Sequence, residues 1–174
     1  LWFNVEMKRM ESDNSMAFIF AGDDTFFIVN LKGKLFYGEI DFSKYDRTQG
    51  KHALSAAIRI EHALGMDIKT CDAMYCSYIS SSKYEEKSLN YKARISMPVQ
   101  RATGGPDTTI GNTINNMLSI IHSLHRVETL EDIPRMQSEM GFQSKFFMDN
   151  ELMGKTFLKG GFFLKKDQEN FTWL

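Results

Sequence analysis

The chain has 174 residues, of which 43% are hydrophobic and 25% charged. This length fits one compact domain with a core and is too short for two domains of ordinary size. No apolar stretch is long enough to span a bilayer, because the longest is interrupted at residues 22–24. The formal net charge of −1 argues against nucleic-acid binding by this chain alone, since phosphate binding normally requires a basic surface.

Hydrophobic periodicity and turn residues predict one α+β domain without internal repeats. In chain order we expect a hairpin of strands at 16–21 and 25–30, a turn at 31–34, a strand at 35–41, helices at 53–64 and 67–79, a polar loop at 80–88, strands at 91–95 and 99–102, a helix across 110–124, a short helix at 132–140, and strands at 142–148 and 156–164.

The helix across 110–124 carries the clearest amphipathic pattern. Apolar residues recur at intervals of four and three, at Ile110, Ile114, Met117, Ile121 and Leu124. We expect these five side chains to pack into the core.

A Gly-Asp-Asp triplet at 22–24 separates the first two predicted strands. Nucleotidyl transfer requires two divalent ions, and hard Mg²⁺ prefers carboxylate oxygens on a rigid frame. By itself, however, the triplet is also an ordinary turn, because turns favour Gly and Asp.

The next strand strengthens the metal interpretation. If residues 32–33 form a two-residue turn, Asp24 faces Asp41 across an antiparallel pair, with Cβ atoms about 5 Å apart. Asp41 then lies beside Asp23 as well, and three carboxylates on one sheet edge repel one another unless a cation binds.

Several segments resemble the palm of viral RNA-dependent RNA polymerases, an antiparallel sheet of the ferredoxin or RRM type packed against helices. DFSKYD at 41–46 resembles motif A, and TGGPDTTIGN at 103–112 fits the motif B pattern. GDD at 22–24 resembles motif C, while GFQSK at 141–145 and TFLKGG at 156–161 resemble motifs D and E. The resemblance covers nearly the whole chain.

The order of these motifs is C, A, B, D, E, with the motif C hairpin before the motif A strand, whereas ordinary palms run A, B, C, D, E. This order is similar to that of permutotetravirus and birnavirus polymerases, although those typically do not carry an unmodified Gly-Asp-Asp. The resemblance implies a single palm domain over residues 1–174. We expect it to be a fragment of a larger polymerase whose fingers and thumb lie largely outside this chain.

The resemblance also implies metal ligands and a proton donor. Asp41 and Asp23 are the expected principal ligands of two Mg²⁺ or Mn²⁺ ions, and Asp24 is a weaker ligand. Lys145 is the expected acid that protonates the departing pyrophosphate, with Lys155 as a rival and a solvated surface lysine as the alternative.

A second set of residues is expected to bind the incoming nucleotide. Asp46 and Asn112 correspond to residues that recognise the ribose 2′-hydroxyl, and Thr108 supports them. Thr103 and Gly104 belong to a flexible loop near the templating base. The alternatives are that Asp46 caps the following helix and that Asn112 is an ordinary polar helix residue.

The implied function is template-directed RNA synthesis in viral replication, in the host cytoplasm or the virion. The implied partners are an RNA template, a primer or nascent strand, ribonucleoside triphosphates and the remaining polymerase subdomains. Without a basic channel, the isolated chain is expected to be inactive. Alternatives are a reverse transcriptase or another palm nucleotidyltransferase, although Asp46 argues against the reverse transcriptase, and a non-catalytic α+β interaction domain.

The two cysteines, Cys71 and Cys76, are expected to be reduced intracellular thiols. Together with His122 and His125 they offer an alternative zinc site, although their spacing suits neither usual zinc pattern.

Overall fold

The computed structural model describes residues 8–10, 15–80, 83–89, 91–164 and 171–173. Its elements in chain order are β1 (Met16–Ala21), β2 (Asp24–Leu31), β3 (Lys34–Phe42), α2 (Tyr45–Thr48), α3 (Lys51–Ala63), α4 (Ile68–Ser80), β4 (Lys83–Lys87), β5 (Lys92–Ser96), α5 (Thr108–Leu124), a 3₁₀ turn (Leu130–Asp132), α6 (Ile133–Glu139), β6 (Ser144–Asp149), β7 (Thr156–Phe157), β8 (Gly160–Leu164) and β9 (Phe171–Trp173). The expected α+β class is confirmed.

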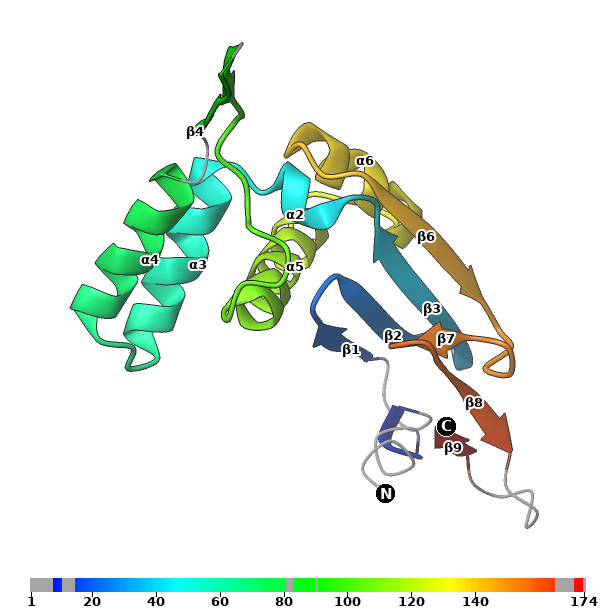
Figure 1. The fold of residues 1–174 in the computed structure, drawn as a ribbon. Helices are drawn as coiled ribbons and strands as arrows, with labels where there is room; N and C mark the ends of the chain where they lie inside the picture. Colours follow the sequence, from blue (N-terminus) through cyan, green and yellow to red (C-terminus); the bar gives the residue numbers. More distant parts are fainter. Residues whose placement is uncertain (1–7, 11–14, 81–82, 90, 165–170, 174) are drawn as a thin grey trace.

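A four-stranded antiparallel sheet with the order β1-β2-β3-β6 forms the centre of the molecule (Figure 1). Strand β2 is buried on both faces, because Phe27 and Val29 point to one core and Phe26 and Ile28 to another. Side chains alternate along a strand, so this division also fixes the face on which every polar residue of β2 lies.

Helices α5 and α6 cover one face of the sheet, and β7 and β8 lie against the other (Figure 1). The core under the helices contains Phe27, Val29, Ile40, Phe42, Tyr45, Ile120, Ile133 and Phe142. The opposite core contains Met10, Phe26, Ile28, Tyr37, Leu152 and Phe162. Helices α3 and α4 pack together through a third, smaller cluster.

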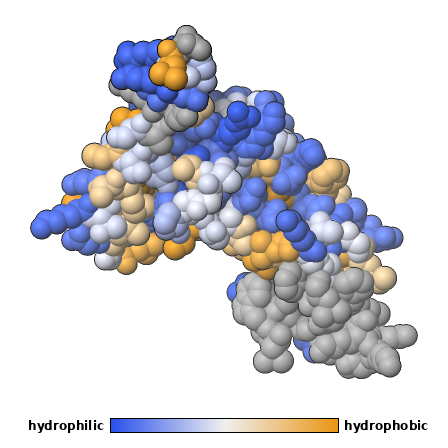
Figure 2. All heavy atoms as spheres, in the orientation of Figure 1, coloured by the Kyte–Doolittle hydropathy of each residue, from blue (hydrophilic) through white to orange (hydrophobic). Residues whose placement is uncertain are grey.

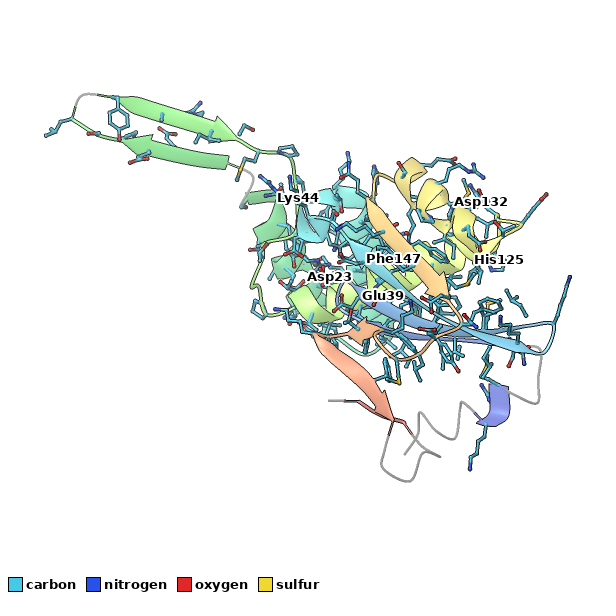
Figure 3. The ribbon with its side chains drawn as sticks, turned by 90° about the vertical axis from the view of Figure 1, so that its right-hand side faces the viewer. Asp23, Glu39, Lys44, His125, Asp132 and Phe147 are labelled. Atoms are coloured by element: carbon cyan, nitrogen blue, oxygen red, sulfur yellow. The ribbon has the colours of Figure 1, made fainter. Side chains whose placement is uncertain are left out.

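The expected polar loop at 80–88 is wrong, because strand β4 lies within it and pairs with β5. The hairpin is held by cross-strand charge pairs: Glu85 lies 2.7 Å from the Lys92 Nζ and 3.1 Å from an Arg94 guanidinium nitrogen. Figure 3 shows the hairpin extending away from the body, and Figure 2 shows it as a separate lobe at the top of the molecule. Alternating charges, which predict a solvated loop, here stabilise an exposed ribbon.

One predicted strand is wrong, and another is divided in two. Residues 99–102 belong to no strand; the Arg101 N–H instead donates to the Asp46 carbonyl at 3.1 Å. The stretch 156–164 is divided into β7 and β8 by a turn at Leu158 and Lys159, whose φ angles are 52° and 61°. The hydrophobic pattern distinguishes neither an unpaired segment such as 99–102 from a strand nor a turn without glycine such as 158–159 from the strands beside it.

Helix α5 forms where expected, but its buried face differs from the predicted one. Ile110 is 56% exposed and Ile121 is 45% exposed, so the expectation that both pack in the core is wrong. The buried residues are Gly111, Asn112, Ile114, Asn115, Asn116, Ser119, Ile120 and Ser123. Most of these are polar; the three asparagines hydrogen-bond to segments outside the helix, and the hydroxyls of Ser119 and Ser123 donate to carbonyls of the helix itself.

The short helix at 132–140 is confirmed as α6, with Gly141 at φ 91° after its end. Asp132 occupies the N-cap position, but its side chain makes no capping bond and instead accepts from Thr129 and Arg135. Among the described residues, no helix combines the length and the apolar character that crossing a bilayer requires.

Candidate active site

The β1–β2 connection places an acidic tip at one end of the sheet. Ala21 pairs with Asp24, so the turn consists of Gly22 and Asp23 alone. Gly22 has φ 63°, the left-handed value that a type II′ turn requires at its first central position. Asp23 follows it as the exposed residue at the tip.

The β2–β3 connection brings a further carboxylate to the same end. Lys32 and Gly33 form a two-residue turn with φ values of 55° and 82°, the sign pattern of a type I′ hairpin turn. The predicted register is therefore confirmed, and Asp24 lies directly opposite Asp41. On the next strand, Lys145 lies directly opposite Asp41.

These side chains line a cavity of about 660 Å³, which we call the acidic hollow. It is bordered by Asp23, Asp24, Glu39 and Asp41, together with Lys145 and Lys159. Burial raises the pKa of Asp24, and the negative charges of Asp23, Asp41 and Glu39 raise it further. Figure 3 shows Asp23 and Glu39 on the same side of the molecule. The hollow thus concentrates negative charge at the end of the sheet.

The β7–β8 hairpin closes one side of the acidic hollow. Glu39 accepts hydrogen bonds from the Thr156 backbone at 3.1 Å and from its hydroxyl at 3.0 Å. A bond from the Leu158 backbone N–H opposes the rise in the pKa of Asp24. The left-handed turn at Leu158 is therefore fixed against the acidic strands.

Helix α5 holds the acidic turn from the other face of the sheet. The Gly22 N–H donates to the Thr113 hydroxyl at 2.7 Å. Asn116 donates to the carbonyls of Gly22 at 3.3 Å and Asp24 at 3.2 Å, and accepts from the Thr25 hydroxyl at 2.8 Å. Four hydrogen bonds thus fix the backbone that carries Asp23.

A second cavity of about 400 Å³, the polar hollow, lies on the helix side of the turn. Its lining consists of Gly22, Asp23, Lys44, Tyr45, Asp46, Arg47, Thr103, Thr108, Thr109 and Asn112. Asp23 borders both hollows. The structure therefore places the acidic tip next to the residues that the sequence predicts to bind the nucleotide.

Asp46 is held by two hydrogen bonds from distant segments. Its Oδ1 accepts from Asn112 Nδ2 at 2.8 Å, and its Oδ2 accepts from the Thr103 hydroxyl at 2.6 Å. Lys44 occupies the N-cap position of α2 and Gly50 that of α3, and neither helix has a side-chain cap. The capping alternative for Asp46 is thus wrong, and Asn112 is a buried residue of α5 that bonds Asp46 and Gln49 outside the helix.

Thr108 holds the loop before α5 through hydrogen bonds to the backbone of that loop, rather than through a bond to Asp46. The Thr108 hydroxyl donates to the Ala102 carbonyl at 2.9 Å, and its backbone N–H donates to the Gly105 carbonyl at 3.0 Å. Gly104 lies inside this loop at φ 79°. Any support that Thr108 gives to Asp46 is therefore exerted through the loop that carries Thr103.

The two candidate lysines lie in different environments. Lys145 is exposed in the acidic hollow opposite Asp41. Lys155 is nearly buried, and its Nζ lies 2.6 Å from an Asp149 carboxylate oxygen at the other end of β6. The Lys155 hydrogen bond lowers the pKa of Asp149. Geometry thus favours Lys145 as the lysine of the acidic hollow.

The acidic hollow offers the right kind of donors for a hard divalent cation. Among the residues that the structure describes, no three His, Cys, Asp or Glu side chains converge closely enough to hold an ion as they stand. The same statement applies to the alternative zinc set, whose Cys71 is buried and Cys76 exposed. Asp24 and Asp41, however, lie directly opposite each other on β2 and β3, and side chains at such paired positions are close enough to interact.

Several residues of this region escaped sequence reasoning. They are Glu39, Gln49, Arg101, Thr113 and Asn116. Burial of Gln49 and Arg101 follows from contacts between distant segments and leaves no local signal. For Thr113 and Asn116 a signal exists, because polar residues recur at helical spacing along α5.

Comparison with known proteins gives a family match and a relative. The profile of a family described as RNA dependent RNA polymerase matches residues 28–136. The replicase polyprotein 1ab of Beet yellows virus (isolate Ukraine) is 29% identical over an alignment of 128 residues. The match covers 63% of this chain. The matched part is 4% of that polyprotein's length.

Proposed function

Because the chain belongs to the RNA-dependent RNA polymerase family, we propose that it is the catalytic palm of a viral polymerase, which copies an RNA template from ribonucleoside triphosphates. The observation that carries this proposal is the position of Asp23. It borders both the acidic hollow, with Asp24 and Asp41, and the polar hollow, with Asp46 and Asn112. A metal-binding edge beside a sugar-binding pair suits nucleotidyl transfer.

In this proposal Asp23 and Asp41 hold two Mg²⁺ or Mn²⁺ ions, with Asp24 as a weaker ligand. Carboxylate oxygens are the donors that these ions prefer. The bound ions supply Lewis-acid activation of the attacking hydroxyl and charge neutralisation at the pyrophosphate. Burial is the largest cause of the raised pKa of Asp24, and the charges of Asp23 and Asp41 add to it; this second contribution supports the assignment, because carboxylates that repel one another gain stability when a cation binds.

Asp46 and Asn112 select the ribose in the polar hollow. A carboxylate and an amide can bracket a hydroxyl that both donates and accepts. The 2.8 Å bond between them and the Thr103 bond to the same carboxylate support this role. Gly104 and Thr108 shape the loop that brings Thr103 there.

Lys145 is the proposed proton donor for pyrophosphate. It faces Asp41 across β3 and β6 and is exposed in the acidic hollow. A lysine there can move a proton to the leaving group, because its ammonium is cationic and accessible. Lys155 is committed to Asp149 and takes no part.

The motif order that we propose is C, A, B, D, E, as in permutotetravirus and birnavirus polymerases. Two observations support it. The two-residue turn at 32–33 joins the acidic hairpin directly to the strand of Asp41. The family match begins at residue 28, after the Gly-Asp-Asp turn, and covers the stretches that resemble motifs A and B.

The proposal assigns residues 1–174 to one palm domain that works with fingers and thumb supplied outside it. Those parts contribute the basic channel that a net charge of −1 does not provide. RNA template, primer or nascent strand and ribonucleotides are the partners, and replication takes place in the host cytoplasm or the virion. Family membership favours this proposal over a reverse transcriptase or an interaction domain.

Primer extension by the complete polymerase tests the metal site. We expect Asp23→Asn and Asp41→Asn to remove nearly all nucleotidyl transfer, because each keeps the side-chain shape and removes a ligand charge. Asp132→Asn, an exposed acid beside α6, is the matched control and should retain activity. Full activity of the Asp41→Asn enzyme would exclude the proposed metal site.

Sugar choice tests the second part of the site. We expect Asp46→Ala or Asn112→Ala to reduce the preference for ribonucleotides over deoxynucleotides by roughly ten- to a hundredfold, since an unpaired buried polar group costs about 1–3 kcal/mol. Competition between the two nucleotides at fixed Mg²⁺ measures it. Equal losses with both sugars would assign Asp46 and Asn112 to structure.

A further inference from the structure

A chain of hydrogen bonds leads from a buried arginine to the pair that faces the nucleotide. Arg101 Nε donates to Gln49 Oε1 at 2.8 Å. Gln49 Nε2 donates to Asn112 Oδ1 at 2.6 Å, and Asn112 Nδ2 donates to Asp46 Oδ1 at 2.8 Å. The chain therefore consists of two amides between a guanidinium and a carboxylate.

The two ends of this chain fix the direction of both amides. Arginine can only donate, so the oxygen of Gln49 must face Arg101 and its nitrogen must face Asn112. An ionised carboxylate can only accept, so the nitrogen of Asn112 must face Asp46. Both constraints require the same orientation of Asn112. A second donor, Asn115 Nδ2 at 2.7 Å from Gln49 Oε1, holds Gln49 in the same sense.

The arginine end of this series of hydrogen bonds is held in place and excluded from water. Arg101 is 2% exposed and Gln49 is 0% exposed. The Arg101 guanidinium lies 2.6 Å from an Asp107 carboxylate oxygen, and it also bonds the Tyr78 hydroxyl of α4. It packs on Gly111, where a Cβ atom would come within 2.3 Å of the guanidinium. Neither water nor a rotation of Arg101 can therefore replace its bond to Gln49.

We propose that Gln49 and Arg101 are positioning residues for sugar selection: they set the donor and acceptor direction of Asn112 and Asp46 in the polar hollow. This inference rests on the proposed function, because it assumes that Asn112 and Asp46 meet the ribose. Neither Gln49 nor Arg101 lines the polar hollow, so their side chains act on the nucleotide through Asn112, whereas the backbone N–H of Arg101 bonds the Asp46 carbonyl whatever side chain it carries. Their loss changes which sugar is accepted more than it changes the overall rate.

Gln49→Glu is the sharpest test, because it keeps size and shape and pairs well with Arg101. A carboxylate at this position cannot donate to Asn112 Oδ1. Either that oxygen faces a carboxylate, or Asn112 turns over and directs its oxygen at Asp46. We expect the preference for ribonucleotides to fall by about tenfold, which corresponds to the loss of one buried hydrogen bond.

Gln137→Glu is the matched control. Gln137 is also 0% exposed and bonds Ser119 and Ser144, and among the described residues no hydrogen bond links Gln137, Ser119 or Ser144 to Asp46. It should alter thermal stability without altering sugar preference. The measurement is single-nucleotide extension by the complete polymerase with each triphosphate in turn, alongside thermal unfolding of each variant.

Unchanged sugar preference in a folded Gln49→Glu enzyme overturns the inference, and so does an equal shift in Gln137→Glu. If Gln49→Glu does not fold, Gln49→Leu decides, because leucine has a similar size and cannot donate to Asn112 Oδ1, whatever else holds position 49. A shift in sugar preference then supports the inference, and no shift overturns it. Failure of the proposed function is distinguishable, since wild-type enzyme would then show no extension or Asp46→Ala would leave sugar choice intact.

Discussion

Replacing Asn116 by leucine tests how the acidic turn is held in place. Leucine has a similar size but no polar atoms, so the Thr25 hydroxyl and the carbonyls of Gly22 and Asp24 lose their partner. The hydroxyl is buried, whereas the carbonyl bonds are longer and lie near the solvent. We estimate a total cost of about 2–3 kcal/mol, mostly from the hydroxyl.

For a chain of this length that cost lowers the melting temperature by about 5–10 °C. Circular dichroism during heating measures it. Ser123→Ala is the matched control, because Ser123 is equally buried on α5 but bonds only within its own helix. It should cost less than about 1 kcal/mol. A melting temperature of Asn116→Leu equal to that of wild type would refute the bracing role.

The same substitution should weaken catalysis beyond its effect on stability. Once Asn116 is lost, the Thr113 bond to Gly22 is the hydrogen bond between α5 and the turn that remains among the described residues. Asp23 is then less well positioned, and a misplaced catalytic group loses rate steeply. Primer extension well below the melting temperature should show the loss in Asn116→Leu and normal activity in Ser123→Ala.

Four further outcomes follow from the site. Burial and neighbouring carboxylates raise the pKa of Asp24 in the folded protein, so the stabilisation that protonated Asp24 contributes is complete below the ordinary pKa of 3.8 and is lost as pH rises through the folded pKa. At pH 7 without divalent ions, Asp24→Asn should therefore have a higher melting temperature than wild type. This difference in melting temperature should vanish in acid. Lys145→Ala should slow nucleotidyl transfer at unchanged melting temperature, whereas Lys155→Ala should leave the rate intact and cost about 1 kcal/mol of stability, as rate and melting assays will show. Lys44→Ala should raise KM for triphosphates without changing sugar choice, because this cation lines the polar hollow, and steady-state kinetics measures both. Primer extension by the 174 residues alone should give no product, since their net charge of −1 cannot hold template and primer.

The hairpin geometry could be predicted from the sequence because it depends on local rules. A two-residue turn at Lys32 and Gly33 fixes every pair in β2 and β3, including Asp24 with Asp41. The positions of β1, β2 and β3 and of the α3, α4 and α6 helices follow from similarly local patterns. The resemblance to polymerase motifs then selected Asp46 and Asn112, which the structure brings together.

What could not be predicted depends on contacts between distant segments. The exposure of Ile110 and Ile121 reflects a helix whose buried face is polar, and hydrophobic periodicity assigns such a face to solvent. Gln49 and Arg101 are buried because partners distant in the sequence satisfy their hydrogen bonds, and they bond each other across 52 positions of sequence. No propensity scale reports such a pairing.

The β1–β2–β3 meander determines how the acidic edge assembles during folding. Its two connections have two residues each, so pairing Asp24 with Asp41 closes only short loops, at small entropic cost and on a microsecond timescale. The braces from Thr113 and Asn116 lie about 90 residues further along the chain, at sequence separations of 91 and 92. We expect Asp24 and Asp41 to pair first in a hairpin that Thr113 and Asn116 do not yet hold. Repulsion between the two carboxylates then destabilises this folding nucleus. Divalent ions should then accelerate folding, whereas loss of Asn116 should chiefly accelerate unfolding.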